Sequence, residues 1–301
     1  MPWAVAAQAC LSACDLIAAF PVLVFRPSIK KDAFMNLKPS AALAAPIATL
    51  LTFMASDAAA QAFDAVRLFG PAGEERGLVG LGVIAGREYL GSDERRTRVV
   101  PLLDYQWRNG FFAGTSNGIG YNFSSRPDLD FGLRVTADLG RDETRSPRLR
   151  GLGDIDAAAE VGAFFNVSPL KGLTLTSSLR YGAGNDNKGL VVDLGAVYST
   201  DLSASWRLAV GVAGSFVNDE YMQEFFGITP AQSQRSGYAT YTADAGLRDL
   251  RANLSLTYSF APRWSVTGAV SASRLLGDAA DSPIAVKDST VNGLLAVSYA
   301  F

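Results

Sequence analysis

Hydrophobic and polar residues alternate along most of the chain after residue 78. In the last segment, VNGLLAVSYAF (291–301), Leu295 and Phe301 share one face, whereas Asn292 and Ser298 lie on the other. Successive side chains of a β-strand point to opposite faces, so this period of two predicts strands. The segments with this pattern are 78–87, 97–107, 111–123, 129–140, 156–167, 172–182, 189–199, 204–217, 249–260, 263–274 and 290–301. The sequence therefore predicts an all-β fold.

These segments are long, and their less apolar face carries charge. They contain roughly ten to thirteen residues, whereas a globular strand has about five or six and a tilted transmembrane strand needs about 9–11. Charged side chains on one face suit a wet lumen better than the dry core of a sandwich. They are Arg134, Asp138, Glu160, Arg180, Asp193, Arg207 and Arg251. We therefore predict a transmembrane antiparallel up-and-down β-barrel whose apolar face meets lipid.

Aromatic residues gather near the ends of the predicted strands, as they do at membrane interfaces. They are Tyr105, Trp107, Phe111, Trp206, Phe216, Tyr258, Phe260, Trp264, Tyr299 and Phe301. A soluble lipocalin-like barrel would also explain the alternation. It would not explain the strand lengths, the charged face or an aromatic residue at the end of the last strand. The membrane barrel is therefore preferred.

The number of strands is the weak point of this interpretation. Bacterial barrels close with an even number of strands, whereas eleven segments alternate. Either 63–69 adds a twelfth strand, or 78–123 is only two strands; we predict twelve, with ten as the alternative. The connections 124–128, 168–171, 200–203 and 261–262 are expected to be short periplasmic turns. The connections 141–155, 183–188, 218–248 and 275–289 are expected to face outward.

The N-terminal part resembles a targeting segment. Residues 35–62 combine Lys38, an apolar run and small residues at Ala60 and Ala62, which together predict a signal peptide cleaved near either alanine. Residues 1–34 are then expected to be an upstream mis-start or a disordered extension. A lipoprotein signal ending at Cys14 is a weaker alternative because no positive charge precedes it. We expect a short periplasmic segment over 63–77 and the outer-membrane barrel over 78–301.

The composition excludes several chemistries. The chain has no histidine, which removes Ser-His-Asp triads and histidine zinc sites, and both cysteines, Cys10 and Cys14, precede the predicted barrel. The formal net charge of −2 does not indicate nucleic-acid binding. We therefore expect no enzyme activity, cofactor, metal site or nucleic-acid partner.

Two groups of residues are candidates for assembly and binding. Tyr299 and Phe301 resemble the C-terminal insertion signal that the barrel assembly machinery reads. The longest predicted loop, 218–248, is unusually apolar, and long apolar loops are often functional or folded inward. Its binding-surface candidates are Tyr221, Phe225 and Phe226. The alternative is that these residues pack on the barrel itself.

Arginines in the predicted outward loop 141–155 are candidates for contact with lipopolysaccharide. They are Arg141, Arg145, Arg148 and Arg150. The guanidinium group matches phosphate in a bidentate geometry. Acidic residues in the same loop reduce its net positive charge. The alternative is that these arginines form an ordinary solvated surface and bind no lipopolysaccharide.

Several blocks resemble the MipA/OmpV family of outer-membrane proteins. They are YLGSD (89–93), RVVPLLDYQW (98–107), GDIDAAAEVG (153–162), EFFGITPAQSQRSGYATYTADAGLRDL (224–250), SRLLGDAADSPI (273–284) and the closing SYAF. Their order and spacing span about 78–301, whereas residues 1–34 have no counterpart.

The resemblance implies an outer-membrane barrel of a Gram-negative bacterium. It also implies a non-enzymatic scaffold that links a lytic transglycosylase to a peptidoglycan synthase. The alternatives are a small-solute channel or a surface and adhesion protein involved in osmotic adaptation. The resemblance assigns no binding residue, and short periplasmic turns leave 63–77 as the first place to look for a partner site.

Overall fold

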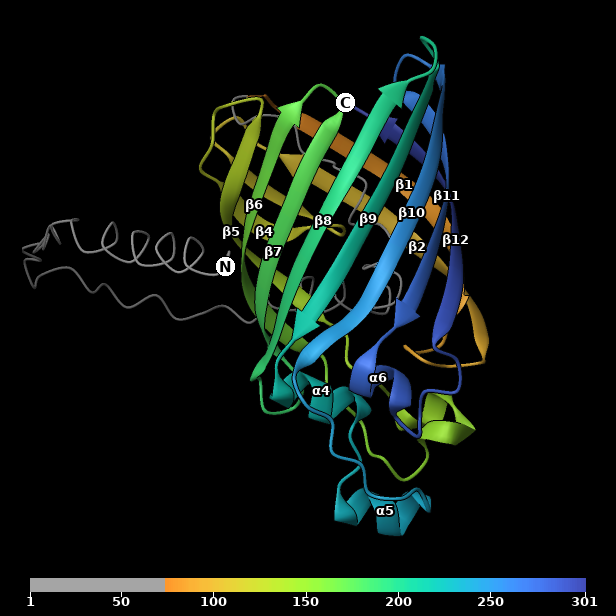
Figure 1. The fold of residues 1–301 in the computed structure, drawn as a ribbon. Coiled ribbons are helices and arrows are strands. Elements are labelled where there is room, and N and C mark those ends of the chain that lie inside the picture. The colour runs from red at the N-terminus through yellow and green to blue at the C-terminus, as the bar shows by residue number, and fades with distance from the viewer. Residues whose placement is uncertain (1–73) are drawn as a thin grey trace, which may run out of the picture. The chain divides into compact units, whose positions relative to one another are not determined.

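The computed structural model describes residues 74–301, which form a closed antiparallel barrel of twelve strands (Figure 1). The strands are β1 (Arg76–Arg87), β2 (Arg95–Gln106), β3 (Phe111–Gly114), β4 (Gly118–Asn122), β5 (Leu129–Asp138), β6 (Ala158–Leu170), β7 (Leu173–Ala183), β8 (Gly189–Asp201), β9 (Trp206–Val217), β10 (Gly246–Ala261), β11 (Trp264–Leu275) and β12 (Ser289–Ala300). Each strand pairs with its sequence neighbours, and β1 pairs with β12 to close the ring. The predicted barrel class is confirmed. The predicted segments 1–34 and 35–62, and residues 63–73, lie outside the described residues.

Helices occur only in the connections of the described region. They are the 3-10 helices η2 (Glu143–Arg145) and η3 (Pro147–Leu149) and the α-helices α4 (Asp219–Phe226), α5 (Pro230–Ser236) and α6 (Gly277–Asp281). Among residues 74–301, none of the helices is long and apolar enough to cross a membrane.

The count of twelve strands is right, but the source of the twelfth was not predicted. The predicted strand 111–123 is two strands, β3 and β4, joined by a turn at Thr115–Asn117. Gly118 ends this turn with a φ of +73°, a conformation that glycine adopts easily. The turn residues are polar, but the outward apolar positions keep the same odd-numbered phase before it (Phe111) and after it (Ile119 and Phe123), which hid the turn. The other proposed source, 63–69, lies outside the described residues.

The β3–β4 hairpin is much shorter than β2. Within residues 74–301, the outer part of β2 therefore has no partner strand on the side of this hairpin. β3 pairs only with Asp104, Tyr105 and Gln106 of β2. The Leu103 amide donates to Thr115 Oγ1 and its carbonyl accepts from the Thr115 amide, so the backbone of Leu103 faces the hairpin. Backbone direction alternates along a strand, so Pro101 and Val99 face the same side beyond the hairpin tip. Proline lacks an N–H and is suited to such an edge.

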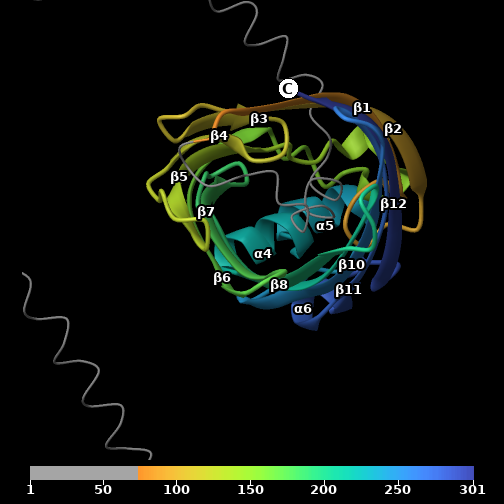
Figure 2. The ribbon, with the colours of Figure 1, turned by 90° about the horizontal axis from the view of Figure 1, so that it is seen from above.

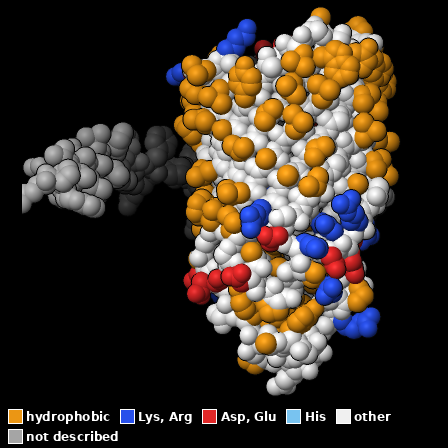
Figure 3. Space-filling model, turned by 45° about the vertical axis from the view of Figure 1, so that its right-hand side comes forward, with side chains coloured by type: hydrophobic (Ala, Val, Ile, Leu, Met, Phe, Trp, Pro, Cys, Tyr) orange, Lys and Arg blue, Asp and Glu red, His pale blue; other side chains and the backbone are white. Residues whose placement is uncertain are grey.

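The outer surface of the barrel is apolar, as predicted (Figure 3). Leu81, Val99 and Leu133 are 63%, 65% and 58% exposed in the isolated barrel. Figure 3 shows hydrophobic side chains over the wall and charged side chains gathered toward the end that carries the helices. The end near residue 301 has short turns, and the opposite end has the long connections. In barrels of this kind the short turns are periplasmic, which defines the two faces.

Aromatic side chains form a girdle at the periplasmic end. Trp206 stacks on Tyr258 with ring centroids 4.6 Å apart, and Trp264 lies 5.1 Å from Tyr299. These rings are partly exposed, as interfacial aromatics are.

Phe301 seals the seam between the first and last strands. Its amide and carbonyl each form a 2.9 Å hydrogen bond with Gly77. A Cβ atom at Gly77 would lie 2.4 Å from the ring of Phe301, so the glycine lets the ring cover the seam. Tyr299 and Phe301 thus lie on the outer face of the closing strand, where a role in assembly remains a prediction.

The unpaired edge of β2 predicts where proline is tolerated. Val99 faces this edge, whereas Val212 of β9 pairs with Ala252 of β10 and Ala196 of β8. Both valines point outward, with exposures of 65% and 57%. Val99→Pro removes no ladder hydrogen bond, so we expect its urea midpoint to stay near that of the wild type. Val212→Pro breaks the ladder and is expected to fold poorly.

The measurement is urea unfolding followed by the heat-dependent shift of the folded barrel on a denaturing gel. Equal losses of stability in the two variants would show that the outer part of β2 is paired on both sides.

Candidate functional site

The long outward connections 139–157, 218–245 and 276–288, together with 88–94, fold into a cap over the extracellular end of the lumen. Viewed along the barrel, α4 lies within the ring of strands (Figure 2). Asn218 caps α4 by accepting from the Tyr221 amide at 3.1 Å, and the same oxygen accepts from the Leu190 amide at 2.8 Å. One asparagine therefore starts the helix and fixes it to the beginning of β8.

The cap has its own apolar core. Its largest cluster joins α4 to the barrel rim and to α6 and contains Ile155, Ala183, Val191, Val217, Tyr221, Met222, Phe225, Phe226, Ala243, Leu275 and Ala279. Tyr221 stacks on Phe225 with centroids 4.4 Å apart and planes 17° apart. Ser282, just after α6, donates to the Phe226 carbonyl, and Tyr241 donates to the Asp278 carbonyl at 2.9 Å. The connections of the cap therefore support one another.

This packing places the three aromatic candidates of the apolar loop inside the cap. Tyr221, Phe225 and Phe226 are only 2%, 8% and 2% exposed. They do not form an outward-facing aromatic surface but pack on their own barrel, which was the alternative. Any binding role for them requires a pocket inside the cap.

Below the cap, arginines and carboxylates from neighbouring strands form a buried network. Arg180 of β7 contacts Glu160 at 3.1 Å and Asp193 at 3.0 Å. Arg251 of β10 contacts Asp193 at 2.9 Å and Asp249 at 3.4 Å. Because each carboxylate faces at least one guanidinium, the charges compensate one another in a part of the barrel that is largely shielded from water.

Arg248 connects this network to the cap. Its Nε contacts Asp249 at 2.7 Å, and its Nη1 donates to the hydroxyl of Tyr221 at 2.6 Å. A register shift between Leu247 and Asp249 lets the two consecutive residues Arg248 and Asp249 both be buried. The alternation could not identify Arg248 because a bulge interrupts the period of two.

Three other charged residues that were predicted to face the lumen, Arg134, Asp138 and Arg207, differ in how deeply they are buried. Arg134 is half-buried and donates to Ser178 at 2.7 Å, and Asp138 is buried and accepts from the Gly140 amide at 2.8 Å. Arg207 differs, because it is exposed and contacts Asp201 at 2.8 Å near the periplasmic end. Near the periplasmic end Asp130 is also buried and accepts from the Asn122 side chain at 3.2 Å, so buried polar groups occur at both ends of the barrel.

The four arginines proposed to contact lipopolysaccharide separate into two kinds. Arg141 is 8% exposed and its Nη1 donates to the Phe225 carbonyl at 2.7 Å, so it is not on the outer surface. Arg148 is exposed and forms two 3.2 Å bonds with Asp93, and Arg145 lies 3.6 Å from Asp142. Arg150 is exposed after η3. Contact with lipopolysaccharide remains a proposal for Arg145, Arg148 and Arg150 only.

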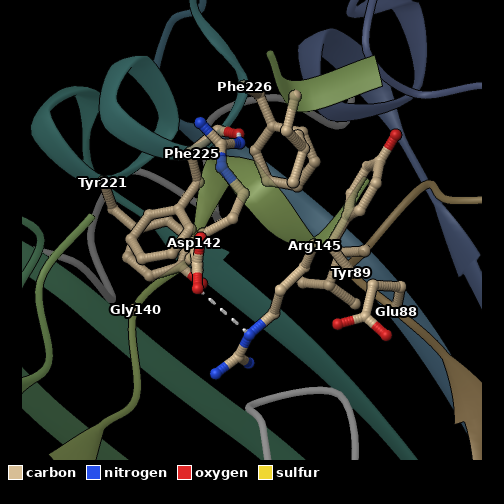
Figure 4. Close-up of a pocket in the computed structure, with 11 residues that line it drawn as sticks. Glu88, Tyr89, Gly140, Asp142, Arg145, Tyr221, Phe225 and Phe226 are labelled. Carbon is tan, nitrogen blue, oxygen red and sulfur yellow. Dashed lines mark hydrogen bonds and ion pairs between the residues drawn. The ribbon is translucent and has the colours of Figure 1, made fainter. Parts of the chain in front are cut away.

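A small pocket of about 40 Å³ lies within the cap (Figure 4). It is lined by Glu88, Tyr89, Leu90, Gly140, Arg141, Asp142, Arg145, Leu149, Tyr221, Phe225 and Phe226. In Figure 4 the stacked rings of Tyr221 and Phe225 lie on one side, and Tyr89 and Glu88 lie on the other. Within residues 74–301, no group of three or more acidic or cysteine side chains could hold a metal ion.

The network predicts a large difference between two similar substitutions. Asp193→Asn removes the charge that faces both Arg180 and Arg251, and it should lower the free energy of unfolding by about 3 kcal/mol or more. Asp201→Asn breaks an exposed pair with Arg207 and should change stability very little. Urea unfolding of both variants checks this, and similar midpoints would contradict a buried, coupled network.

The chain is similar to several solved outer-membrane proteins at low sequence identity. The chain is similar to the KdgM porin, with 10% identity over 74% of this chain and 99% of that chain and a TM-score of 0.41. It is similar to an outer-membrane channel from Pseudomonas putida F1, with 13% identity over 79% and 98% and a TM-score of 0.42. For the translocator domain of the autotransporter NalP from Neisseria meningitidis, the identity is 14% over 86% and 98%, with a TM-score of 0.45. The comparison with curated proteins finds no match.

The family comparison is more specific. The family described as MltA-interacting protein MipA matches residues 79–301, which confirms the resemblance carried by the sequence blocks. With its closed twelve-stranded barrel, the protein is an outer-membrane protein of a Gram-negative bacterium, as predicted. The match covers nearly all of the described barrel, and the chain belongs to the MipA family of MltA-interacting proteins.

Proposed function

We propose that this protein is a non-enzymatic outer-membrane scaffold that holds a peptidoglycan-processing enzyme at the periplasmic face. The observation that carries the proposal is the cap over the outer part of the lumen together with the ion-pair network beneath it. A barrel filled in this way is poorly suited to free passage of solutes. We therefore look for the partner site at the accessible periplasmic end.

The family description supports an interaction rather than a reaction. It names MltA as the partner of the name-giving protein. We extend this to the present chain and propose a lytic transglycosylase as the first partner, with a peptidoglycan synthase as the second. The absence of histidine from the whole chain agrees with a non-enzymatic role, because imidazole is the commonest general base.

The periplasmic turns alone offer little area for such a partner. A standard interface buries about 800 Å² on each side, whereas the turns between β6 and β7 or between β10 and β11 contain only two residues each. The segment before β1 can supply the rest. Its described end is fixed to the rim, because Glu75 accepts from the hydroxyl of Tyr105 and lies 3.4 Å from Arg108.

We therefore propose that the partner binds the periplasmic rim together with residues 63–75. The small-solute channel is the second candidate, favoured by the polar lumen, but the cap and the buried ion pairs at the extracellular end count against it. The surface and adhesion alternative has no specific contact in its favour.

Binding of a purified lytic transglycosylase to the folded chain 63–301 tests the scaffold. Removal of 63–75 should weaken binding at least tenfold while the barrel stays folded, because β1 begins at Arg76. The matched control is Arg150→Glu on the extracellular side, which should leave the affinity unchanged. Biolayer interferometry measures the affinities, and the heat-dependent gel shift checks folding.

Equal affinity with and without 63–75 would exclude this segment as the partner site. No binding by the intact folded chain would contradict the scaffold itself.

A further inference from the structure

The cap contains a buried cation without an acidic partner among the described residues. Arg141 is 8% exposed, its Nη1 donates to the Phe225 carbonyl, and its Nε is buried without a hydrogen-bond partner. Arg248 and Arg251 are similarly buried, but each contacts a carboxylate. A buried charge is costly unless it is paired, so Arg141 is the exception that needs an explanation.

The end of α4 neutralises Arg141 only in part. The Phe225 carbonyl lies in the last turn of this helix, where the helix dipole amounts to about half a negative charge. Burial lowers the pKa of Arg141 to about 10, so the guanidinium stays charged at neutral pH. Burial also raises the pKa of Tyr89 to about 12, so this neighbouring phenol stays neutral and supplies no negative charge.

The carboxylates of the pocket are already engaged. Glu88 accepts from Arg96 at 2.7 Å and from Arg98 at 3.1 Å. Asp142 accepts from the amide and the hydroxyl of Thr144 at 2.8 and 2.6 Å. The lining itself carries Arg141 and Arg145 against Glu88 and Asp142, and Glu224 is a further acidic neighbour of Arg141. From outside the lining, Arg96 and Arg98 pair with Glu88. With Glu88 already paired, Arg141 and Arg145 are the cations that line the pocket beside its aromatic wall.

We propose that this pocket binds a small dissolved oxyanion, either a carboxylate or a phosphate group, from the extracellular side. Arg141 is the buried contact, and the half-exposed Arg145, which lies 3.6 Å from Asp142, is the outer contact. A volume of about 40 Å³ holds one such group, since a water molecule needs about 10–15 Å³ by the same measure. A larger ligand would keep the rest of its structure outside the cap.

Lipopolysaccharide phosphates carry the same chemistry but lie beside the barrel. Arg141 lies inside the cap against the end of α4, so the dissolved anion is the source to which the geometry points. This inference concerns the extracellular face and does not depend on a periplasmic partner.

Calorimetric titration of the folded chain 63–301 in a neutral, chloride-free detergent solution tests the site. The probes are sodium acetate and sodium phosphate at matched ionic strength, and we expect saturable binding of at least one. Arg141→Met should weaken binding at least tenfold. The control Arg150→Met removes an exposed arginine from the same connection and should leave the affinity unchanged.

Several results would overturn the proposal. They are the absence of saturable binding to the wild type, equal binding by the Arg141→Met and Arg150→Met variants, and binding of lipopolysaccharide micelles without competition by either free anion. If Arg141→Met does not fold, Arg145→Met decides the question. A severalfold weaker affinity in that variant supports the site, and an unchanged affinity contradicts it.

Discussion

The structure depends on the need of every backbone amide within a membrane to find a hydrogen-bond partner inside the protein. Closing the sheet through β1 and β12 meets this need along the seam, where Gly77 and Phe301 exchange two backbone hydrogen bonds. The hairpin of β3 and β4 completes only the periplasmic part of the wall next to β2. At the remaining edge Pro101 removes one donor that would otherwise lack a strand partner.

Closure also determines where polar side chains lie. With lipid outside, the charged residues of the alternating strands face the lumen, and there they must compensate one another. Asp193 does so between Arg180 and Arg251, and Arg248 extends the same network to the hydroxyl of Tyr221. The cap is therefore tied to the barrel by polar contacts as well as by its apolar core. This is the physical reason why we propose a scaffold and not a solute channel.

The sequence predicted much of the fold because strand alternation is a local property. It identified the lipid-facing side, the closing strand at Phe301 and the short and long connections. It missed the turn at 115–117, because the outward apolar positions keep the same phase on both sides of it. It also missed Arg248, which a bulge lets be buried together with Asp249. The candidate sites were less predictable. Whether Phe225 faces solvent and which carboxylate an arginine meets depend on contacts between segments far apart in the chain, as the bond from Arg141 to the Phe225 carbonyl illustrates.

The central claim is that the cap and the ion-pair network block the lumen to solutes, and that the barrel serves to hold a periplasmic partner at the outer membrane. Planar-bilayer recording of the folded chain 63–301 at neutral pH tests it most directly. The account predicts insertion without stable conductance steps in the wild type. Uniform, long-lived steps from the wild-type protein would contradict it and would make the solute channel the better description.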